Sequence, residues 1–449
     1  MNVDQLLELF TKSTGVCTDT RKLQPGNLFF ALRGPNFDGN RYAASALEQG
    51  AVAAVVDDST LVQTAGCLLV EDTLSALQRL ATAYRNTWTC PVVALTGSNG
   101  KTTTKELLAA CLATEYEVSF TTGNLNNHIG VPLTLLSTPS SAEIVVVEMG
   151  ANHQGEIAAL CEIARPTHGF ITNIGRAHLE GFGGPEGVRK GKGELFAYLA
   201  EARGVAFYDL ADEVVSGLAE QVTATIAYQT KARLHVVSAE TPLVEATLVE
   251  EFPFVSAELK SAEDSIRVRS QLPGSYNFKN LVQAAAVAHY FKVPLGRIAN
   301  AIGAYRPQNS RSEVRQVGKA AVLLDAYNAN PDSMLAGLRW LANRTETHKF
   351  ALLGEMRELG AFAKTAHTDL LRQVAELGEI EVLVLGDAYR ETAEPSDLAL
   401  IRADSAEQAA TWLSEIFEQS DAVVLLKGSR ANRLEQVLAK AEKDYTNRL

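Results

Sequence analysis

The sequence predicts a three-domain α/β protein, with a small N-terminal α/β domain, a central domain built on a parallel sheet, and a C-terminal Rossmann-like, doubly wound domain. The chain has 449 residues, which is more than one compact hydrophobic core accommodates. Continuous apolar runs alternate with helical segments after the first fifth of the chain, a pattern typical of parallel sheets covered on both faces. The pattern changes twice, which predicts domains over residues 1–86, 87–308 and 309–449.

The first segment mixes short apolar runs with turn signals. Pro25, Gly26 and Asn27 precede an apolar run at 28–32, and a second run at 51–56 has the character of a buried strand. Residues 73–84 have the pattern of a helix. These elements indicate a small α/β unit.

The central segment opens with an apolar run at 92–95 that ends in a glycine-rich turn. A helix is expected over 103–112, directly after that turn. The next buried run, at 144–147, ends at Glu148. Strands and helices in this order indicate a parallel sheet.

The end of the central segment has a different character. Alternating strands at 234–237 and 266–268 predict an antiparallel insertion between about residues 220 and 272. A helix over 278–290 is expected to close the domain.

The third segment repeats strand–helix cycles. Its apolar runs lie at 322–324, 351–353, 382–385 and 423–426. A polar residue lies one or two residues beyond the end of each run, in turn Asp325, Glu355, Asp387 and Lys427. Ligands bind beyond the carboxyl ends of strands in open parallel sheets, so these positions are candidates for a site.

Composition excludes several classes of protein. The formal net charge is -12, and an acidic surface repels nucleic acids and anionic membrane surfaces. The five cysteines are odd in number, widely spaced and without a Cys-x-x-Cys pair, which indicates reduced thiols. The first ten residues lack the features of a signal peptide, and no apolar run has the length of a membrane span. We therefore expect a cytoplasmic protein.

The strongest local signal is the turn at 96–103, between a buried strand and a helix. Its glycines allow backbone N–H groups to point at phosphate oxygens, and the following helix adds the positive end of its dipole. Lys101 is expected at the β- and γ-phosphates of ATP and the Thr102 hydroxyl at Mg²⁺. Leu95 stands where the eight-residue pattern has glycine, so the match is to a shorter variant; the alternative is a chance Gly-Lys-Thr turn. The predicted ATP-binding residues of this loop are Gly97, Ser98, Asn99, Gly100, Lys101, Thr102 and Thr103.

Two further side chains are candidates for metal contact. Glu148 ends the next buried strand, where a carboxylate can face the loop and hold Mg²⁺, a cation that prefers oxygen ligands. His178 ends a comparable loop after Asn173. An ordinary strand-end acid and a hydrogen-bonded polar histidine are the alternatives.

The order of these motifs resembles that of the Mur ligases. The resemblance rests on the loop at 96–103, on Glu148-Met149-Gly150-Ala151-Asn152, and on the run from Asn173 to Glu180. It extends through 124–132, 325–333 (Asp-Ala-Tyr-Asn-Ala-Asn-Pro-Asp-Ser), 354–360 and 427–430, and therefore covers all three domains. The Tyr-Asn-Ala-Asn-Pro sequence of the third domain discriminates best between members of this family.

The resemblance implies an ATP-dependent amide ligase. The implied reaction joins D-alanyl-D-alanine to UDP-N-acetylmuramoyl-tripeptide through an acyl phosphate, in peptidoglycan synthesis. The implied cofactors are ATP and two Mg²⁺ ions, and the expected state is a monomer. Whether the tripeptide ends in diaminopimelate or lysine stays open.

The resemblance also assigns roles to residues. Lys101, Glu148, His178 and Lys192 are the implied catalytic set, and Lys192 falls where relatives carry a carbamoylated lysine. The implied metal contacts are Thr102, Glu148, His178 and Lys192. Beyond the loop, the implied ATP contacts are Asn280 at the adenine, Arg311 at the γ-phosphate and Asp325. The implied substrate contacts are Thr20, Arg21, Asp38, Asn124, Asn126, Asn127, Asn328, Asn330 and Lys427.

Rival interpretations share the central motifs. A folylpolyglutamate synthase would lack the N-terminal uridine-nucleotide domain, and other Mur ligases have different text at 327–330. A P-loop switch or a non-catalytic nucleotide-binding module has no evident use for Lys192, His178 and a third α/β domain.

Overall fold

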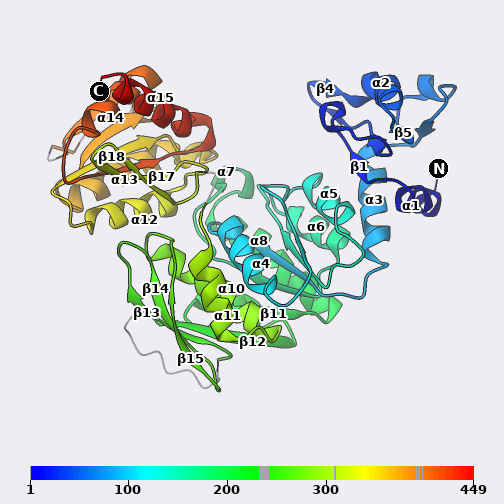
Figure 1. Ribbon diagram of the computed structural model, residues 1–449, viewed down its shortest axis with the longest axis horizontal. Coiled ribbons are helices and arrows are strands. Elements are labelled where there is room, and N and C mark those ends of the chain that lie inside the picture. The colour runs from blue at the N-terminus through cyan, green and yellow to red at the C-terminus, as the bar shows by residue number, and fades with distance from the viewer. Residues whose placement is uncertain are drawn as a thin grey trace.

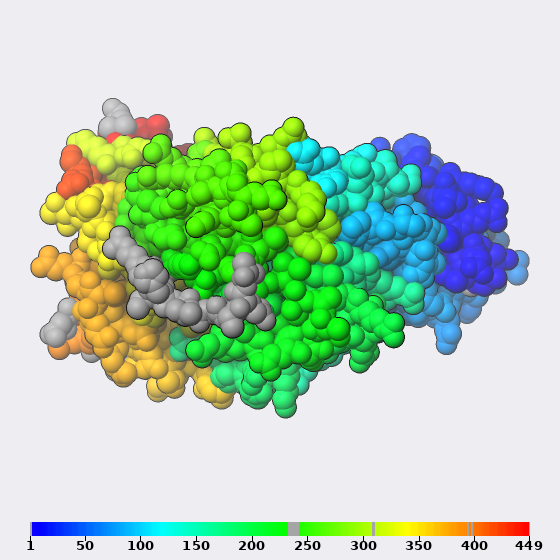
Figure 2. All heavy atoms as spheres, turned by 90° about the horizontal axis from the view of Figure 1, so that it is seen from below, coloured from blue at the N-terminus to red at the C-terminus, as the bar shows by residue number. Residues whose placement is uncertain are grey.

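The computed structural model describes residues 2–231, 242–307, 310–390, 392, 395–396 and 398–448. The described strands form sheets of four, nine and six strands and a two-stranded hairpin. In Figure 1, the unit around the first sheet (blue) and the unit around the third sheet (yellow to red) lie above the central unit, at its opposite ends. Figure 2 shows the same order from another side, with the N-terminal residues at one end of an elongated molecule. The predicted three-part α/β architecture is confirmed.

The N-terminal unit is a parallel sheet in the order β1-β2-β5-β6, with helices against it. The strands β2 and β5 are entirely buried, as their apolar text predicts. Helix α3 packs against α1 and also against α5 and α6 of the central unit, so it joins the two units. The elements are α1 (Val3–Thr11), β1 (Val16–Cys17), η1 (Thr20–Lys22), β2 (Leu28–Phe30), β3 (Arg33–Gly34), β4 (Phe37–Asp38), η2 (Gly39–Tyr42), α2 (Ala43–Glu48), β5 (Ala53–Val56), η3 (Ser59–Leu61), β6 (Cys67–Leu69) and α3 (Thr73–Arg85).

The central sheet has the order β15-β14-β13-β12-β11-β10-β7-β9-β8 and is parallel from β8 to β13. The chain leaves β7 toward β9 and β8 on one side and reaches β10 on the other. The carboxyl end of β7 is therefore a topological switch point, where open parallel sheets bind ligands. The parallel strands are β7 (Val92–Thr96), β8 (Val118–Phe120), β9 (Ile144–Glu148), β10 (His168–Ile171), β11 (Val205–Asp209) and β12 (Ala224–Lys231).

Helices cover both faces of this sheet. The helices α4 and α10 pack against each other, and α8 lies against β10 (Figure 1). The predicted helices at 103–112 and 278–290 lie within α4 and α10. The helices are α4 (Lys101–Leu112), α5 (Gly130–Leu136), α6 (Glu156–Ala164), α7 (Leu179–Phe182), α8 (Pro185–Ala202), α9 (Glu213–Ala219), α10 (Tyr276–Tyr290) and α11 (Leu295–Ala304).

An antiparallel extension completes the central sheet, as the alternating text predicts. Its strands are β13 (Glu245–Glu250), β14 (Ser256–Lys260) and β15 (Ser265–Arg269), of which β14 pairs antiparallel with both others. The strand predicted at 266–268 lies within β15. The strand predicted at 234–237 lies outside the described residues.

The third unit is a doubly wound sheet in the order β16-β17-β21-β18-β19-β20, parallel except for the edge strand β16. The register places Asp325 and Lys427 side by side at the ends of β17 and β21. The elements are β16 (Glu313–Val317), β17 (Ala320–Asp325), α12 (Pro331–Ala342), β18 (His348–Gly354), η4 (Gly360–Phe362), α13 (Ala363–Glu376), β19 (Glu381–Leu385), η5 (Asp387–Tyr389), β20 (Leu400–Ala403), α14 (Ala406–Ile416), β21 (Ala422–Lys427), η6 (Arg430–Asn432) and α15 (Leu434–Thr446).

Among the residues described, no helix has the length and apolar character needed to cross a membrane. The cysteines at 17, 67, 90, 111 and 161 are free thiols.

Candidate active site

A cavity of about 660 Å³ lies between the central and third units. Its lining comes from the carboxyl ends of the strands in both sheets and from the loops that follow them. Sixteen of the predicted site residues line it: Ser98, Asn99, Gly100, Lys101, Thr102, Thr103, Asn124, Asn126, Asn127, Glu148, His178, Asn280, Arg311, Asp325, Asn328 and Lys427. Segments separated by more than 300 residues thus meet at one place.

The loop after β7 depends on two close approaches. A Cβ at Gly97 would lie 1.9 Å from Thr172 Oγ1, and a Cβ at Gly100 would lie 2.2 Å from Asn280 Oδ1. Gly100 is also the N-cap of α4, in the left-handed conformation at φ 79°, which glycine adopts without steric cost. The Asn280 side chain, held by a hydrogen bond of 2.9 Å from its Nδ2 to Asn277 Oδ1, therefore packs directly on the loop.

Lys101, the first residue of α4, lies at the loop itself. Its Nζ donates to Gly97 O at 2.7 Å. Burial lowers the pKa of Lys101, and the charge of Glu148 acts in the opposite direction. The ammonium group thus sits among the backbone groups of the loop, where a phosphate would be bound.

Glu148 ends β9 beside the loop and is almost completely buried, with 1% of its side chain exposed. Its Oε1 accepts hydrogen bonds from Thr102 Oγ1 at 3.1 Å and from Asn126 Nδ2 at 2.7 Å. Its Oε2 has no hydrogen-bond partner among the described residues. A buried carboxylate oxygen without a donor is a free ligand position for a cation.

Lys192, on α8, does not line the cavity but lies directly behind it. Its side chain is fully buried, and its Nζ donates to Ala151 O at 3.2 Å and lies 5.0 Å from the centre of the Phe182 ring. Burial lowers the pKa of Lys192 well below its usual value, and the charge of Lys101 adds to the effect. Burial in this place therefore favours the uncharged form of the Lys192 amine.

His178 lines the cavity from the central unit and pairs with a residue of the third unit. Its Nδ1 contacts the carboxylate of Glu358, and this contact lowers the pKa of Glu358. The Glu180 N–H donates to Glu358 O at 3.3 Å in the same region. His178 therefore joins the two units in this structure.

The segment before α12 makes further contacts to the central unit. Asn330 caps α12 by accepting from Ser333 N, and its Nδ2 donates to Asn99 Oδ1 at 2.7 Å. Asn330 thus touches the phosphate loop without lining the cavity. Asp332, two residues later, pairs with Arg176 at 2.7 Å.

The third sheet contributes a charged pair at the cavity wall. Lys427 Nζ lies 2.5 Å from Asp325 Oδ2, and the Lys427 side chain is 2% exposed. Asp325 Oδ1 accepts a hydrogen bond of 3.3 Å from the Ser312 N–H, so Asp325 also contacts the residue that directly precedes β16. Arg311 stacks on Tyr327 at 3.6 Å from the ring centre.

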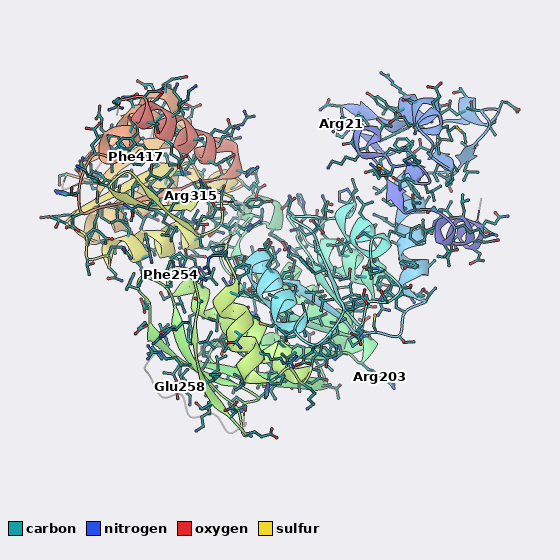
Figure 3. The ribbon with its side chains drawn as sticks, viewed as in Figure 1. Arg21, Arg203, Phe254, Glu258, Arg315 and Phe417 are labelled. Carbon is teal, nitrogen blue, oxygen red and sulfur yellow. The ribbon has the colours of Figure 1, made fainter. Side chains whose placement is uncertain are left out.

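The predicted substrate residues of the first unit lie apart from this cavity. Asp19 caps η1 and pairs with Arg21 at 2.7 Å, next to Thr20. Asp38 caps η2 and accepts from Asn40 Nδ2 at 2.9 Å. Figure 3 labels Arg21 at the edge of the N-terminal unit that faces the third unit in that view. The structure therefore does not join Thr20, Arg21 and Asp38 to the other candidates.

Several cavity residues were not among the predicted contacts. They include Tyr276, Ser312, Arg357, Glu358 and Arg430. Burial raises the pKa of Tyr276, whose hydroxyl lies 3.1 Å from Ser312 Oγ. Arg357, Glu358 and Arg430 lie within the motifs at 354–360 and 427–430. The sequence therefore singled out these segments but not the individual residues.

A phosphate-binding loop at a sheet switch point, with a second α/β unit completing its cavity, defines the class of multidomain P-loop enzymes. Family models narrow this class. They match as the Mur ligase family catalytic domain over residues 12–85, the Mur ligase middle domain over 95–288, and the Mur ligase glutamate ligase domain over 310–430. The chain belongs to the Mur ligase family.

Curated relatives agree with the family models. A protein of Escherichia coli (strain K12) is 35% identical over 445 residues, which is 96% of this chain and 94% of that protein. A protein of Bacillus subtilis (strain 168) is 37% identical over 361 residues, 79% of this chain and 76% of that one. Both are named UDP-N-acetylmuramoyl-tripeptide--D-alanyl-D-alanine ligase. The predicted family and the predicted kind of ligase are confirmed.

Solved structures show the same fold over nearly the whole chain. A MurF of Acinetobacter baumannii is 30% identical and covers 98% of each chain with a TM-score of 0.85. The MurF ligase of Thermotoga maritima, solved in complex with ADP, is 28% identical, with a TM-score of 0.85 over 98% of this chain and all of that one.

Proposed function

We propose that the protein uses ATP to join D-alanyl-D-alanine to the terminal carboxylate of UDP-N-acetylmuramoyl-tripeptide. The products are UDP-N-acetylmuramoyl-pentapeptide, ADP and phosphate, in the cytoplasmic part of peptidoglycan synthesis. One observation carries this proposal: the phosphate loop and Glu148 share a cavity with Arg311, Asp325 and Lys427 of the third unit. The relatives' names supply the substrates.

In the proposed complex, ATP binds among the residues around α4. The backbone N–H groups of 97–102 and the start of α4 bind its phosphates, and Lys101 offsets their charge. The packing of Asn280 on Gly100 supports the proposal that Asn280 contacts the adenine. Arg311 lines the cavity from the junction with the third unit and contacts the γ-phosphate.

The chemistry activates a carboxylate, which is a poor electrophile. The carboxylate oxygen of the tripeptide attacks the γ-phosphorus, the bond to ADP breaks, and an acyl phosphate forms. The amine of D-alanyl-D-alanine then attacks the acyl carbon, loses a proton, and the tetrahedral species expels phosphate. Positive charge from Lys101 and Arg311 stabilises the transferring phosphoryl group.

The residues beside the loop fit Mg²⁺. Glu148 Oε2 is buried without a hydrogen-bond partner in the described residues, and the Thr102 hydroxyl donates to the other oxygen of the same carboxylate. No cluster of three His, Cys, Asp or Glu side chains forms a metal cage in the described ranges, and Mg²⁺ often binds through one or two carboxylates and substrate phosphates. Thr102, Glu148 and His178 would hold it. When bound, Mg²⁺ neutralises charge on the phosphates.

Lys192 is the proposed fourth ligand, after reaction with CO₂. The uncharged form of its amine attacks the carbon of CO₂, the nitrogen releases a proton, and the product is a carbamate with carboxylate-like oxygens. The Lys192 side chain is fully buried and contacts Ala151, which lines the cavity, and this position supports the assignment. A second Mg²⁺ would then have an oxygen donor on α8.

The three predicted domains divide the substrates between them. Residues 1–86 bind the uridine end through Thr20, Arg21 and Asp38, and residues 87–308 bind ATP. Residues 309–449 receive the dipeptide through Asn328, Asn330 and Lys427, and Asn124, Asn126 and Asn127 position the tripeptide. Contact between the second and third units excludes water from the acyl phosphate. The expected monomer stays a prediction.

Phosphate release from ATP tests the proposal. Rapid release should require both UDP-N-acetylmuramoyl-tripeptide and D-alanyl-D-alanine, and the pentapeptide should form in equal amount. Equal ATP turnover without either substrate would support a switch or another nucleotidase. Competition between tripeptides ending in diaminopimelate and in lysine identifies the natural third residue.

A further inference from the structure

Lys105 is a buried cation to which the proposed reaction gives no role. It lies on α4, one turn after Lys101, and its side chain is 0% exposed. It does not line the cavity. A lysine is seldom fully buried unless it is paired, so its partners indicate what it does.

The partners of Lys105 lie at the back of the candidate metal position. Its Nζ donates to Gly123 O at 3.0 Å and lies 3.7 Å from Glu148 Oε2. Glu106 Oε1 lies 3.8 Å away, but Glu106 also accepts a hydrogen bond of 2.7 Å from the Tyr305 hydroxyl. Lys105 therefore approaches the one oxygen of Glu148 that lacks a hydrogen-bond donor in the described chain.

Two hydrogen bonds fix the other side of the Glu148 carboxylate. Thr102 and Asn126 both donate to Oε1, and the Thr121 hydroxyl accepts from the Glu148 N–H at 3.0 Å. These neutral donors do not balance a buried negative charge, which needs a cation nearby. Lys105 supplies such a cation, with its Nζ 3.7 Å from Glu148 Oε2.

We propose that Lys105 is a built-in counter-ion of Glu148, which balances the carboxylate before a divalent cation arrives and weakens the binding of that cation. The proposal rests on the proposed metal role of Glu148. A positive charge this close to Oε2 repels a second one, so the protein alone binds the cation weakly. The phosphates of ATP then add the negative charge that completes the site, which couples metal binding to nucleotide binding.

A purely structural role makes a different prediction. Through Gly123, Lys105 also anchors the segment that leads to Asn124 and Asn126. If anchoring were its only role, a neutral side chain of similar length would alter stability without tightening the binding of a divalent cation.

The experiment measures Mn²⁺ binding to the nucleotide-free protein by electron paramagnetic resonance. The proteins are the wild type, Lys105→Met, Lys105→Arg, Glu148→Gln and the double variant Lys105→Met/Glu148→Gln. Lys105→Met should tighten Mn²⁺ binding by about tenfold or more, because a nearby positive charge is lost. Lys105→Arg should bind as weakly as the wild type, and the double variant should lose the gain.

The outcomes separate this proposal from the proposed function. If Lys105→Met binds Mn²⁺ as weakly as the wild type or more weakly, while Glu148→Gln also binds it more weakly, Lys105 is not a counter-ion of this kind. The proposed metal role of Glu148 is then unaffected. Unaltered binding in Glu148→Gln overturns both. Thermal unfolding provides a second readout: Mg²⁺ should raise the melting temperature of Lys105→Met more than that of the wild type. If Lys105→Met is less stable than the wild type, Mg²⁺ does not restore its stability and its Mn²⁺ affinity is unchanged, the proposal is also contradicted.

Discussion

Arg176 of the central unit and Asp332 of the third unit are joined by three hydrogen bonds. The Arg176 Nε and Nη2 donate to Asp332 Oδ1 at 2.9 and 2.7 Å, and the Arg176 N–H donates to Oδ2 at 2.7 Å. Asn330, two residues before Asp332, donates to Asn99 in the phosphate loop. The third unit is therefore in direct contact with the predicted phosphate-binding loop.

Breaking this contact should loosen the third unit. Both side chains are part exposed, so a double-mutant cycle with Arg176→Ala and Asp332→Ala should give a coupling of about 0.5–1 kcal/mol. We expect a higher KM for D-alanyl-D-alanine and a larger radius of gyration by small-angle X-ray scattering. Arg315→Ala, which removes the exposed Arg315–Glu313 pair within one strand, is the control. Identical scattering and kinetics in all variants would contradict the role.

A substitution at Gly100 should damage nucleotide binding more than stability. Gly100→Ala places a Cβ 2.2 Å from Asn280 Oδ1 in a left-handed residue. We expect ATP affinity to fall by about tenfold or more, equivalent to ~1.4 kcal/mol, measured by calorimetry.

Gly155→Ala is the matched control for that experiment. Gly155 is the N-cap of α6 at φ 85°, as Gly100 is the N-cap of α4, but no atom lies within 4 Å of a Cβ added there. Its left-handed backbone should cost ~1–2 kcal/mol of stability and leave ATP affinity near that of the wild type. Equal losses of affinity in both variants would show that the contact with Asn280 is unimportant.

Asp325 and Lys427 should stabilise the fold only when both are present. Lys427→Met leaves the carboxylate without its cation in a mostly buried place, which should reduce the free energy of unfolding by about 3–5 kcal/mol. The double variant Asp325→Asn/Lys427→Met should recover part of that loss in denaturant titrations. Additive losses would mean that the two side chains do not stabilise each other.

His367 should make the third unit sensitive to acid. Its Nε2 accepts from the Met356 N–H at 3.0 Å and thereby holds the loop that carries Glu358, and its Nδ1 donates to Ala363 O at 2.7 Å. Burial lowers the pKa of His367 below its usual 6.5. The unfolded chain therefore binds the proton more readily, and stability falls as the pH drops from about 6.5 through the lowered pKa.

Thermal and urea unfolding between pH 6.5 and 5 tests this dependence. The wild type should lose stability more steeply than His367→Gln, by at most about 1.4 kcal/mol per pH unit. His168, whose pKa burial lowers to about 4, acts in the same direction and is present in both proteins. Parallel slopes would contradict the role of His367.

Local sequence patterns predicted much of this site because its parts lie at strand ends. The loop at 96–103, Glu148 and Asp325 each follow a continuous apolar run, and such runs are recognisable without knowledge of the fold. The same reasoning predicted the doubly wound third sheet and the helices α4 and α10. These features depend on neighbouring residues only.

Contacts between the units could not be predicted in this way. The pairing of Arg176 with Asp332 and of His178 with Glu358 depends on how two separately folded sheets meet. The sequence does not distinguish Lys105 from other residues of the helix, although its place one turn after Lys101 puts both on one side of α4. That spacing was the available signal, but only the fold shows that Glu148 and Gly123 lie beside it.

In the proposed reaction, ATP activates the substrate's carboxylate as an acyl phosphate. The most direct test uses UDP-N-acetylmuramoyl-tripeptide with ¹⁸O in both oxygens of the terminal carboxylate, together with ATP and D-alanyl-D-alanine. We predict that each released phosphate carries one ¹⁸O atom and that the new amide keeps the other, as measured by mass spectrometry. Unlabelled phosphate released alongside the pentapeptide would contradict this account.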